Sequence, residues 1–166
     1  MARPAGKGCF ITIVCQQSNE KATRNFRGFG AFKSAPKSSD LITVSVSKLR
    51  ILVVDDEPLV CEMVKAMLLQ DGHVVDTAPG GKEALTRFDA DRFDLVLTDY
   101  RMPGMKGDQV ANAIKKRLQP KPVILITGHP PNEAPRGIDW VLLKPFSLLQ
   151  LRLAISDVLE AQQDIR

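Results

Sequence analysis

Short apolar runs recur along the second part of the chain, and each ends at a polar residue. The clearest runs cover residues 50–54, 93–98, 123–126 and 140–143, and a weaker run covers residues 73–77. They are rich in Val, Ile and Leu and show no sustained alternation with polar residues, which is typical of strands buried on both faces. We therefore predict five strands at the centre of one domain.

Helical patterns lie between these runs. Apolar residues recur at 3.6-residue spacing over residues 59–68, 81–88, 110–118 and 148–159. Pro58 suits the first position of a helix, Gly72 suits its end, and Ser147 suits the cap of the last helix. The residues expected to face the core include Met63, Met67 and Leu118. Strands that alternate with helices predict an α/β fold with a parallel sheet covered on both faces.

The first 48 residues differ in composition from the rest. They hold eight basic residues against two acidic ones, a formal charge of +6, whereas residues 49–166 hold fifteen against seventeen, a charge of −2. The positive net charge of the whole chain, +4, therefore comes from this leader. It does not indicate DNA binding by the main body. We expect residues 1–48 to form a basic, mostly disordered leader and residues 49–163 to form the folded domain.

Several interpretations of the leader remain open. A start codon assigned too far upstream, a targeting peptide and a basic tether to nucleic acid or anionic lipid all fit its composition. A short strand at residues 10–14 that docks on the main body is another possibility. No apolar run approaches the length of a membrane span. The three cysteines lack metal-ligand spacing, and their odd number argues against a disulfide framework. We expect a cytoplasmic protein with no membrane partner.

Polar residues follow four of the predicted strands. Asp55 and Asp56 follow the first strand, Asp99 the third, Thr127 the fourth and Lys144 the fifth. Because ligands bind at the carboxyl edge of a parallel sheet, we expect these side chains to meet there. Carboxylates suit Mg²⁺, and with a hydroxyl and an ammonium they suit a phosphoryl group that a carboxylate accepts. Each residue taken alone is also explained as a turn or capping residue.

Four segments resemble the receiver domain of two-component response regulators in order and in spacing. They are ILVVDDEP at residues 51–58, DYRMPGMKG at 99–107, TG at 127–128 and KPF at 144–146. The match extends over residues 49–163. The resemblance implies a flavodoxin-like, doubly wound sheet of five parallel strands in the order 2-1-3-4-5.

The resemblance also implies roles for single residues. Asp99 matches the phosphoacceptor, Thr127 the switch hydroxyl, and Lys144 the lysine that pairs with the phosphoryl group. The peptide bond before Pro145 is typically cis in this family. The implied partner is a sensor histidine kinase or a phosphotransfer protein, whose phosphohistidine donates the phosphoryl group, while the downstream target is not indicated.

Further positions match the metal site of the family. The implied Mg²⁺ ligands are Asp56, assisted by Asp55, together with Asp99 and the backbone carbonyl of Arg101. In the family, the side chains two positions after the acceptor and two after the switch threonine line the path of the attacking water. These are Arg101 and His129 here, and we hypothesise that they set the lifetime of the phosphorylated state.

The sequence departs from the family pattern after Thr127. Lys144 follows Thr127 by only seventeen positions, and residues 128–137 contain three prolines and no helical periodicity. We predict that the fourth helix is shortened or absent. The aromatic switch position of the family is occupied by Val141, while Trp140 points to the other face of its strand. The usual coupling between threonine and aromatic residue is therefore not expected.

These observations favour a phosphorylatable switch, not an enzyme. We expect no output domain after the last helix, so the chain would act as a stand-alone receiver, a phosphorelay intermediate or the receiver fragment of a hybrid kinase. One alternative is a haloacid-dehalogenase-like phosphatase, but Asp55-Asp56 lacks its Asp-x-Asp spacing. Another is a pseudo-receiver that serves only as a scaffold, against which the full acceptor set argues.

Overall fold

The computed structural model describes residues 9–13, 42–46, 48–129 and 135–163. The main body alternates strands and helices in the order β3 (Arg50–Val54), α1 (Pro58–Gln70), β4 (Val74–Ala78), α2 (Gly81–Ala90), β5 (Leu95–Asp99), α3 (Gly107–Lys115), β6 (Val123–Thr127), β7 (Trp140–Leu143) and α4 (Leu148–Gln163). All five predicted strands and all four predicted helices are present.

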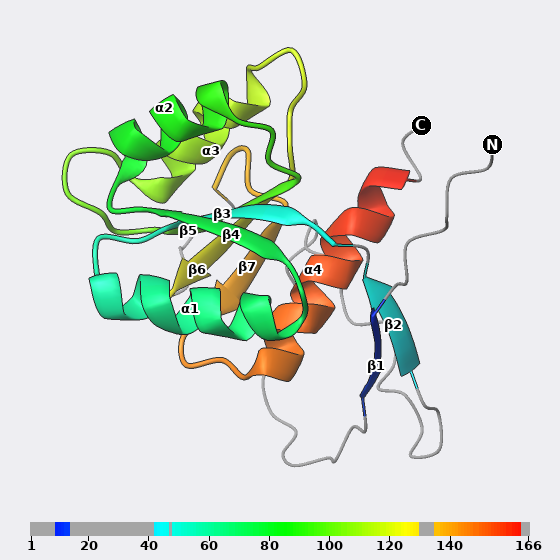
Figure 1. Cartoon of the computed structure of the whole chain (residues 1–166). Coiled ribbons are helices and arrows are strands. Elements are labelled where there is room, and N and C mark those ends of the chain that lie inside the picture. Colours follow the sequence, from blue (N-terminus) through cyan, green and yellow to red (C-terminus); the bar gives the residue numbers. More distant parts are fainter. Residues whose placement is uncertain (1–8, 14–41, 47, 130–134, 164–166) are drawn as a thin grey trace.

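The five strands form one parallel sheet in the order β4-β3-β5-β6-β7. This is the predicted order 2-1-3-4-5, counted within the main body. Helices α1 and α4 cover one face of the sheet, and α2 and α3 cover the other (Figure 1). The predicted flavodoxin-like α/β fold is confirmed.

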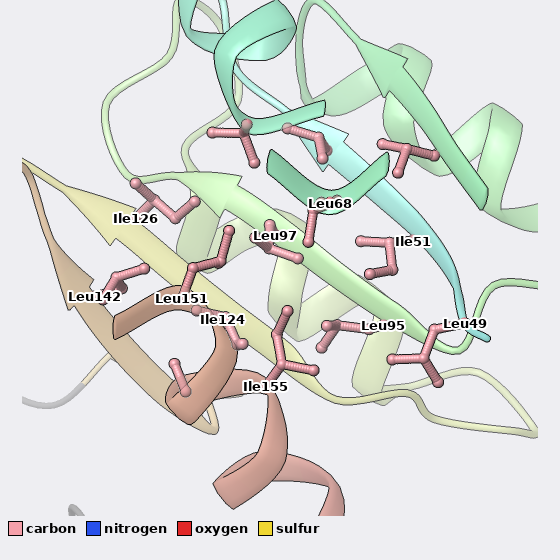
Figure 2. Close-up of a cluster of buried hydrophobic side chains, with 14 of the residues drawn as sticks. Leu49, Ile51, Leu68, Leu95, Leu97, Ile124, Ile126, Leu142, Leu151 and Ile155 are labelled. Atoms are coloured by element: carbon pink, nitrogen blue, oxygen red, sulfur yellow. The ribbon is translucent and has the colours of Figure 1, made fainter. Parts of the chain in front are cut away.

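Two apolar clusters hold these layers together. Ile51 and Val53 pack against α1 and α4, whereas their neighbours Leu52 and Val54 pack against α2 and α3. Figure 2 shows the first cluster, in which side chains of α4 lie over β6 and β5. The strands are apolar at successive positions because both faces are covered, which explains the lack of alternation in the sequence.

Local signals fix the ends of the helices. Pro58 is the first residue of α1, and Gly72 follows its end with a positive φ of 77°. Ser147 caps α4, since its hydroxyl accepts the amide hydrogen of Gln150 while its own amide donates to the Gln150 side chain. Among the described helices, none combines the length and apolar character that crossing a bilayer requires.

Two expectations about the core are wrong. Leu118 is fully exposed, because α3 ends at Lys115 and the chain has left the helix before Leu118 is reached. Met63 is 45% exposed, because the buried side of α1 is formed by Cys61, Val64 and Leu68, and Met63 lies on the other side. Met67 packs partly against the core, as expected.

No helix occurs in the described residues between β6 and β7, namely 128–129 and 135–139. Residues 130–134 of the proline-rich segment lie outside the described residues. Gly137, with a φ of 78°, packs on α3 so closely that a Cβ atom would lie 3.1 Å from the Asn112 amide nitrogen. Within the described part of this connection, the expected fourth helix is therefore not present, and Gly137 lies against α3.

The leader contains a strand that the apolar pattern did not predict. Strands β1 (Cys9–Ile13) and β2 (Ile42–Val46) pair antiparallel in a separate two-stranded sheet. The alternation of Ile42, Val44 and Val46 with polar residues is the signal that could have predicted β2. The strand considered at residues 10–14 corresponds to β1, and the rest of residues 1–47 lies outside the described residues.

Candidate functional site

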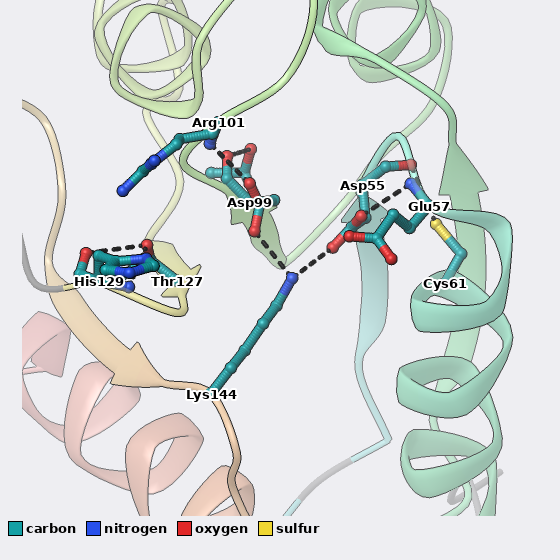
Figure 3. Close-up of polar contacts among 9 residues, drawn as sticks. Asp55, Glu57, Cys61, Asp99, Arg101, Thr127, His129 and Lys144 are labelled. Carbon is teal, nitrogen blue, oxygen red and sulfur yellow. Dashed lines mark hydrogen bonds and ion pairs between the residues drawn. The ribbon is translucent and has the colours of Figure 1, made fainter.

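The ammonium group of Lys144 lies between two carboxylates at the carboxyl edge of the sheet (Figure 3). Its Nζ is 2.8 Å from Oδ1 of Asp99 and 2.9 Å from Oδ2 of Asp55. Both aspartates are shielded from solvent, with 4% of the Asp55 side chain and 12% of the Asp99 side chain exposed. Three residues that come from three separate strand ends therefore meet at one point.

The backbone around each aspartate orients its carboxylate. Asp99 is the last residue of β5, and its Oδ2 accepts the amide hydrogen of Arg101 at 2.6 Å. Asp55 directly follows β3, and its Oδ1 accepts the amide hydrogen of Glu57 at 2.9 Å. In each residue one oxygen is held by the backbone and the other faces Lys144, so the two carboxylates have defined orientations.

Lys144 is kept charged by its two partners. Burial lowers the pKa of its ammonium group, but the hydrogen bonds to Asp99 and Asp55 outweigh that effect, and the pKa is raised overall. Its amide donates to the carbonyl of Thr127 at 2.8 Å, which anchors the start of the loop after β7. The Lys144–Pro145 peptide bond is cis.

The hydroxyl of Thr127 bonds within its own loop. Its Oγ1 donates to the carbonyl of His129 at 3.0 Å and accepts the amide hydrogen of His129 at 3.3 Å. Thr127 is the last residue of β6 and is only 3% exposed. It therefore stands at the same edge of the sheet as Asp99, with its hydroxyl engaged by backbone groups.

The remaining predicted site residues lie around this centre. Asp56, Arg101 and His129 are exposed to solvent, and Val141 is half-buried in β7. Trp140 packs against the cluster under α1 and α4, so it lies on the opposite face of the sheet from the position of Val141. The structure thus brings Asp55, Asp99 and Lys144 into contact and places the other residues at the rim.

The charge of the site suits a divalent cation. Asp55, Asp56 and Asp99 carry three negative charges against one positive charge on Lys144. Within the described residues, however, no three or more side chains of His, Cys, Asp or Glu are grouped as a ready metal site. A Mg²⁺ ion commonly binds through one or two carboxylates and keeps several water ligands. The carboxylates here therefore fit Mg²⁺ better than they fit a metal ion that takes all of its ligands from the protein.

Gly107 packs against the backbone of Asp99, a contact that the sequence pattern did not predict. A Cβ atom at this position would overlap the backbone oxygen of Asp99. Its amide also donates to the carbonyl of Tyr100 at 3.1 Å. The signal was present in the sequence, since Gly107 ends the segment that begins at Asp99, but only the folded chain shows the contact.

The fold and the site define a class of protein, namely flavodoxin-like domains with an acidic, lysine-containing site at the carboxyl edge of the sheet. The family model described as the response regulator receiver domain matches residues 51–156. The chain belongs to this family and is a receiver domain of two-component response regulators.

Solved structures agree with this assignment. The chain resembles the response regulator TrrA of Thermotoga maritima in complex with Mg²⁺-BeF, at 35% identity and a TM-score of 0.62, over 66% of this chain and 98% of that one. It also resembles the chemotaxis protein CheY4 of Vibrio cholerae, at 29% identity and a TM-score of 0.64, over 68% and 99% of the two chains.

Curated relatives include the transcriptional regulatory protein TcrA of Mycobacterium tuberculosis. It is 33% identical over 111 residues, which cover 64% of this chain and 44% of TcrA. The positive alginate biosynthesis regulatory protein of Pseudomonas aeruginosa is 44% identical over 84 residues, 49% of this chain and 34% of that protein. The chain spans less than half the length of these relatives.

Proposed function

We propose that the chain is a phosphorylatable switch that accepts a phosphoryl group on Asp99 from the phosphohistidine of a sensor histidine kinase or phosphotransfer protein. The observation that supports this most directly is the contact of Lys144 with both Asp99 and Asp55 at the carboxyl edge. In this proposal residues 49–163 form the receiver and residues 1–48 a leader.

The chemistry follows from the groups at the site. A carboxylate oxygen of Asp99 attacks phosphorus, the bond between phosphorus and the histidine nitrogen breaks, and the nitrogen keeps the electron pair while the imidazole takes up a proton. Asp99 becomes an acyl phosphate. The ammonium of Lys144 stabilises negative charge on the phosphoryl oxygens, and the hydroxyl of Thr127 donates to one of them after it turns from His129.

Asp55, Asp56, Asp99 and the carbonyl of Arg101 would hold Mg²⁺, which supplies positive charge beside the phosphoryl oxygens. The exposed side chains of Arg101 and His129 would control access of water to the acyl phosphate. The TrrA structure contains Mg²⁺-BeF, which supports this ion for a receiver of this family.

The outer side of α1 offers a docking surface for the kinase. Leu59 is 85% exposed and Met63 45% exposed, and they stand one helical turn apart at the end of α1 that follows Asp55. An exposed apolar pair in the first turns of the helix that follows Asp55 suits contact with an apolar helix. TrrA has been crystallised with the histidine kinase ThkA, and the chain resembles a chain of that complex at 36% identity and a TM-score of 0.61.

The alternatives are less well supported. A haloacid-dehalogenase-like phosphatase places its nucleophile in the first strand, whereas Asp99 ends the third strand of the main body and contacts Lys144. A scaffold without phosphorylation would have no need for a buried ion-pair network at the carboxyl edge.

The test is incubation of the full chain with acetyl phosphate and MgCl₂, followed by intact mass. We expect a gain of one phosphoryl group, which is absent in Asp99→Ala and in the presence of excess EDTA. Asp89→Ala, which removes an exposed carboxylate away from the site, is the matched control and should be phosphorylated like the original chain. Repeated turnover of a phosphoester would indicate a phosphatase, and an unchanged mass would indicate a scaffold.

A further inference from the structure

Strands β1 and β2 form a sheet of their own, separate from the parallel sheet, and we call it the leader sheet. Three of its five residue pairs join two apolar residues, namely Cys9 with Val46, Ile11 with Val44 and Ile13 with Ile42. Opposite residues of an antiparallel pair belong to the same face, and successive residues belong to opposite faces. One face of the leader sheet is therefore apolar at every position. A sheet of two strands is at best marginally stable alone, so this face needs a cover.

The outer side of α4 is partly covered, although it faces away from the core. The side that faces the parallel sheet consists of four buried residues, namely Leu151, Ala154, Ile155 and Val158. With 3.6 residues per turn, Leu149, Leu153 and Ser156 lie on the opposite side of the helix. All three are half-buried, yet neither leucine packs with the described apolar clusters of the main body. Burial also raises the pKa of the neighbouring Asp157, and the charge of Glu160 adds to this effect.

A short link holds the leader sheet close to α4. β2 ends at Val46, and Leu49 is already buried in the cluster that α4 shares with the parallel sheet. The amide of Leu49 donates to Nδ1 of His73 at 3.3 Å, and its carbonyl accepts the amide hydrogen of Val74 at 2.8 Å. Three residues span at most about 10 Å, so the end of β2 lies within that distance of this fixed point. Figure 1 shows the leader sheet on the same side of the main body as α4.

The dimensions of the two surfaces agree. A strand of five residues is about 17 Å long, and β1 and β2 both have this length. On α4, the rise from Leu149 to Glu160 is about 16 Å. A leader sheet that starts near Leu49 and runs along α4 therefore matches the outer side of the helix in length.

The apolar face of the leader sheet is too small to hold two chains together. Two strands about 4.8 Å apart and about 17 Å long form a face of roughly 160 Å². A standard interface buries about 800 Å² on each partner. A short tether, in contrast, raises the effective concentration of the leader sheet at α4 to the order of millimolar, which favours the helix of the same chain. The charges of +6 on the leader and −2 on the main body also attract each other.

We propose that the leader sheet docks through its apolar face on the outer side of α4 of the same chain, at Leu149 and Leu153. The leader is then an intramolecular cover of the last helix and not a free basic tether. None of these residues belongs to the site at the carboxyl edge, so the docking does not depend on phosphorylation of Asp99.

A disulfide across the proposed contact tests the docking in the full chain. Cys9 and Cys15 are first replaced by Ala, which keeps both positions apolar. Val44→Cys is then combined with Leu149→Cys or with Leu153→Cys, and the protein is oxidised with diamide at low concentration. We expect at least one of the two pairs to form a disulfide within one chain, seen as the loss of two hydrogens by intact mass and as a monomer on a non-reducing gel.

The matched control combines Val44→Cys with Leu118→Cys, since Leu118 is fully exposed and lies outside α4. This pair should stay reduced under the same conditions. Cys61 is buried and is kept in all variants.

Hydrogen exchange of the leader, measured by mass spectrometry on the peptides that contain residues 9–13 and 42–46, gives a second test without cross-linking. Leu153→Glu places a charge in the proposed contact, so these peptides should exchange at least about tenfold faster than in the original chain. Leu118→Glu should leave their exchange unchanged.

The other outcomes contradict the docking. Disulfides between two chains would show that a second copy occupies the outer side of α4. Equal yields in the test and control pairs, or no disulfide in any pair, would show that the leader sheet has no fixed place on this helix. Equal exchange of the leader peptides in the Leu153→Glu and Leu118→Glu chains would overturn the proposal as well.

Discussion

Replacement of Lys144 by Met should destabilise the fold when no Mg²⁺ is present. The change keeps most of the side-chain volume but removes the cation between Asp55 and Asp99, whose side chains are only 4% and 12% exposed. Loss of one partner from a buried ion pair costs about 3–5 kcal/mol. Since 24% of the Lys144 side chain is exposed, water compensates in part, and we expect a loss of about 2–3 kcal/mol.

Urea unfolding followed by the fluorescence of Trp140, the one tryptophan in the sequence, measures this loss. With a slope of about 1–2 kcal/mol per molar urea, the midpoint should fall by about 1–3 M. The pKa of Lys144 is raised in the folded chain, so its contribution is complete below the unfolded pKa and is lost only as pH rises through the folded value. The difference between the two chains should therefore stay constant from about pH 6 to 9.

Two controls assign the loss to the carboxylates. In a chain that already carries Asp55→Asn and Asp99→Asn, Lys144→Met should cost less than about 0.5 kcal/mol, because no buried charge is left without a partner. In the single variant, MgCl₂ at a hundredfold excess over its dissociation constant should restore up to about 2.7 kcal/mol. If Lys144→Met unfolds at the same urea concentration as the original chain without Mg²⁺, the reasoning is refuted.

Three further predictions concern other parts of the molecule. Gly107→Ala should slow phosphorylation by acetyl phosphate at least tenfold in folded protein, because its Cβ would displace the Asp99 backbone. The control is Gly81→Ala, whose Cβ would crowd the side chains of Val110 and Met105; it should lower stability but keep the phosphorylation rate per folded molecule. Equal phosphorylation rates in the two variants would contradict this prediction. Leu59→Glu should weaken transfer from a kinase and leave transfer from acetyl phosphate unchanged. Leu118→Glu, at another exposed position outside α1, should affect neither reaction, and a matching loss of kinase transfer in both variants would argue against docking on α1. Burial lowers the pKa of His73, whose Nδ1 accepts the amide hydrogen of Leu49, so its contribution to stability is present above about pH 6.5 and is lost as pH falls below that value. As pH is lowered from 8 to 5, the urea midpoint should therefore fall more steeply for the original chain than for His73→Gln, and parallel curves would exclude this histidine as the cause.

The fold could be predicted because its main signals are local and repeated. Unbroken apolar runs such as residues 123–126 mark strands covered on both faces, and Pro58 and Ser147 mark the starts of helices. Met63 and Leu118 were misplaced because a 3.6-residue pattern does not show where a helix ends or which of two apolar sides faces the sheet. Only the packed structure settles those two points.

The candidate site was predictable in composition but not in contacts. Topology alone brings Asp55, Asp99 and Lys144 to one edge, since all three follow parallel strands. The sequence could not show that the Thr127 hydroxyl bonds to the His129 backbone, because that bond depends on a side-chain rotamer. The close approach of Gly107 to Asp99 likewise depends on how α3 meets β5, which no local pattern encodes.

The bond from the Lys144 amide to the Thr127 carbonyl has a consequence for redesign of this protein. Thr127 is paired with Leu143 in the sheet, and Lys144 follows Leu143 directly. The backbones of Thr127 and Lys144 are therefore joined at the carboxyl ends of β6 and β7. A substitution at one of these positions that is meant to alter the lifetime of the proposed acyl phosphate should therefore be expected to shift the other position as well. Exposed neighbours such as Arg101 offer a freer choice of substitutions.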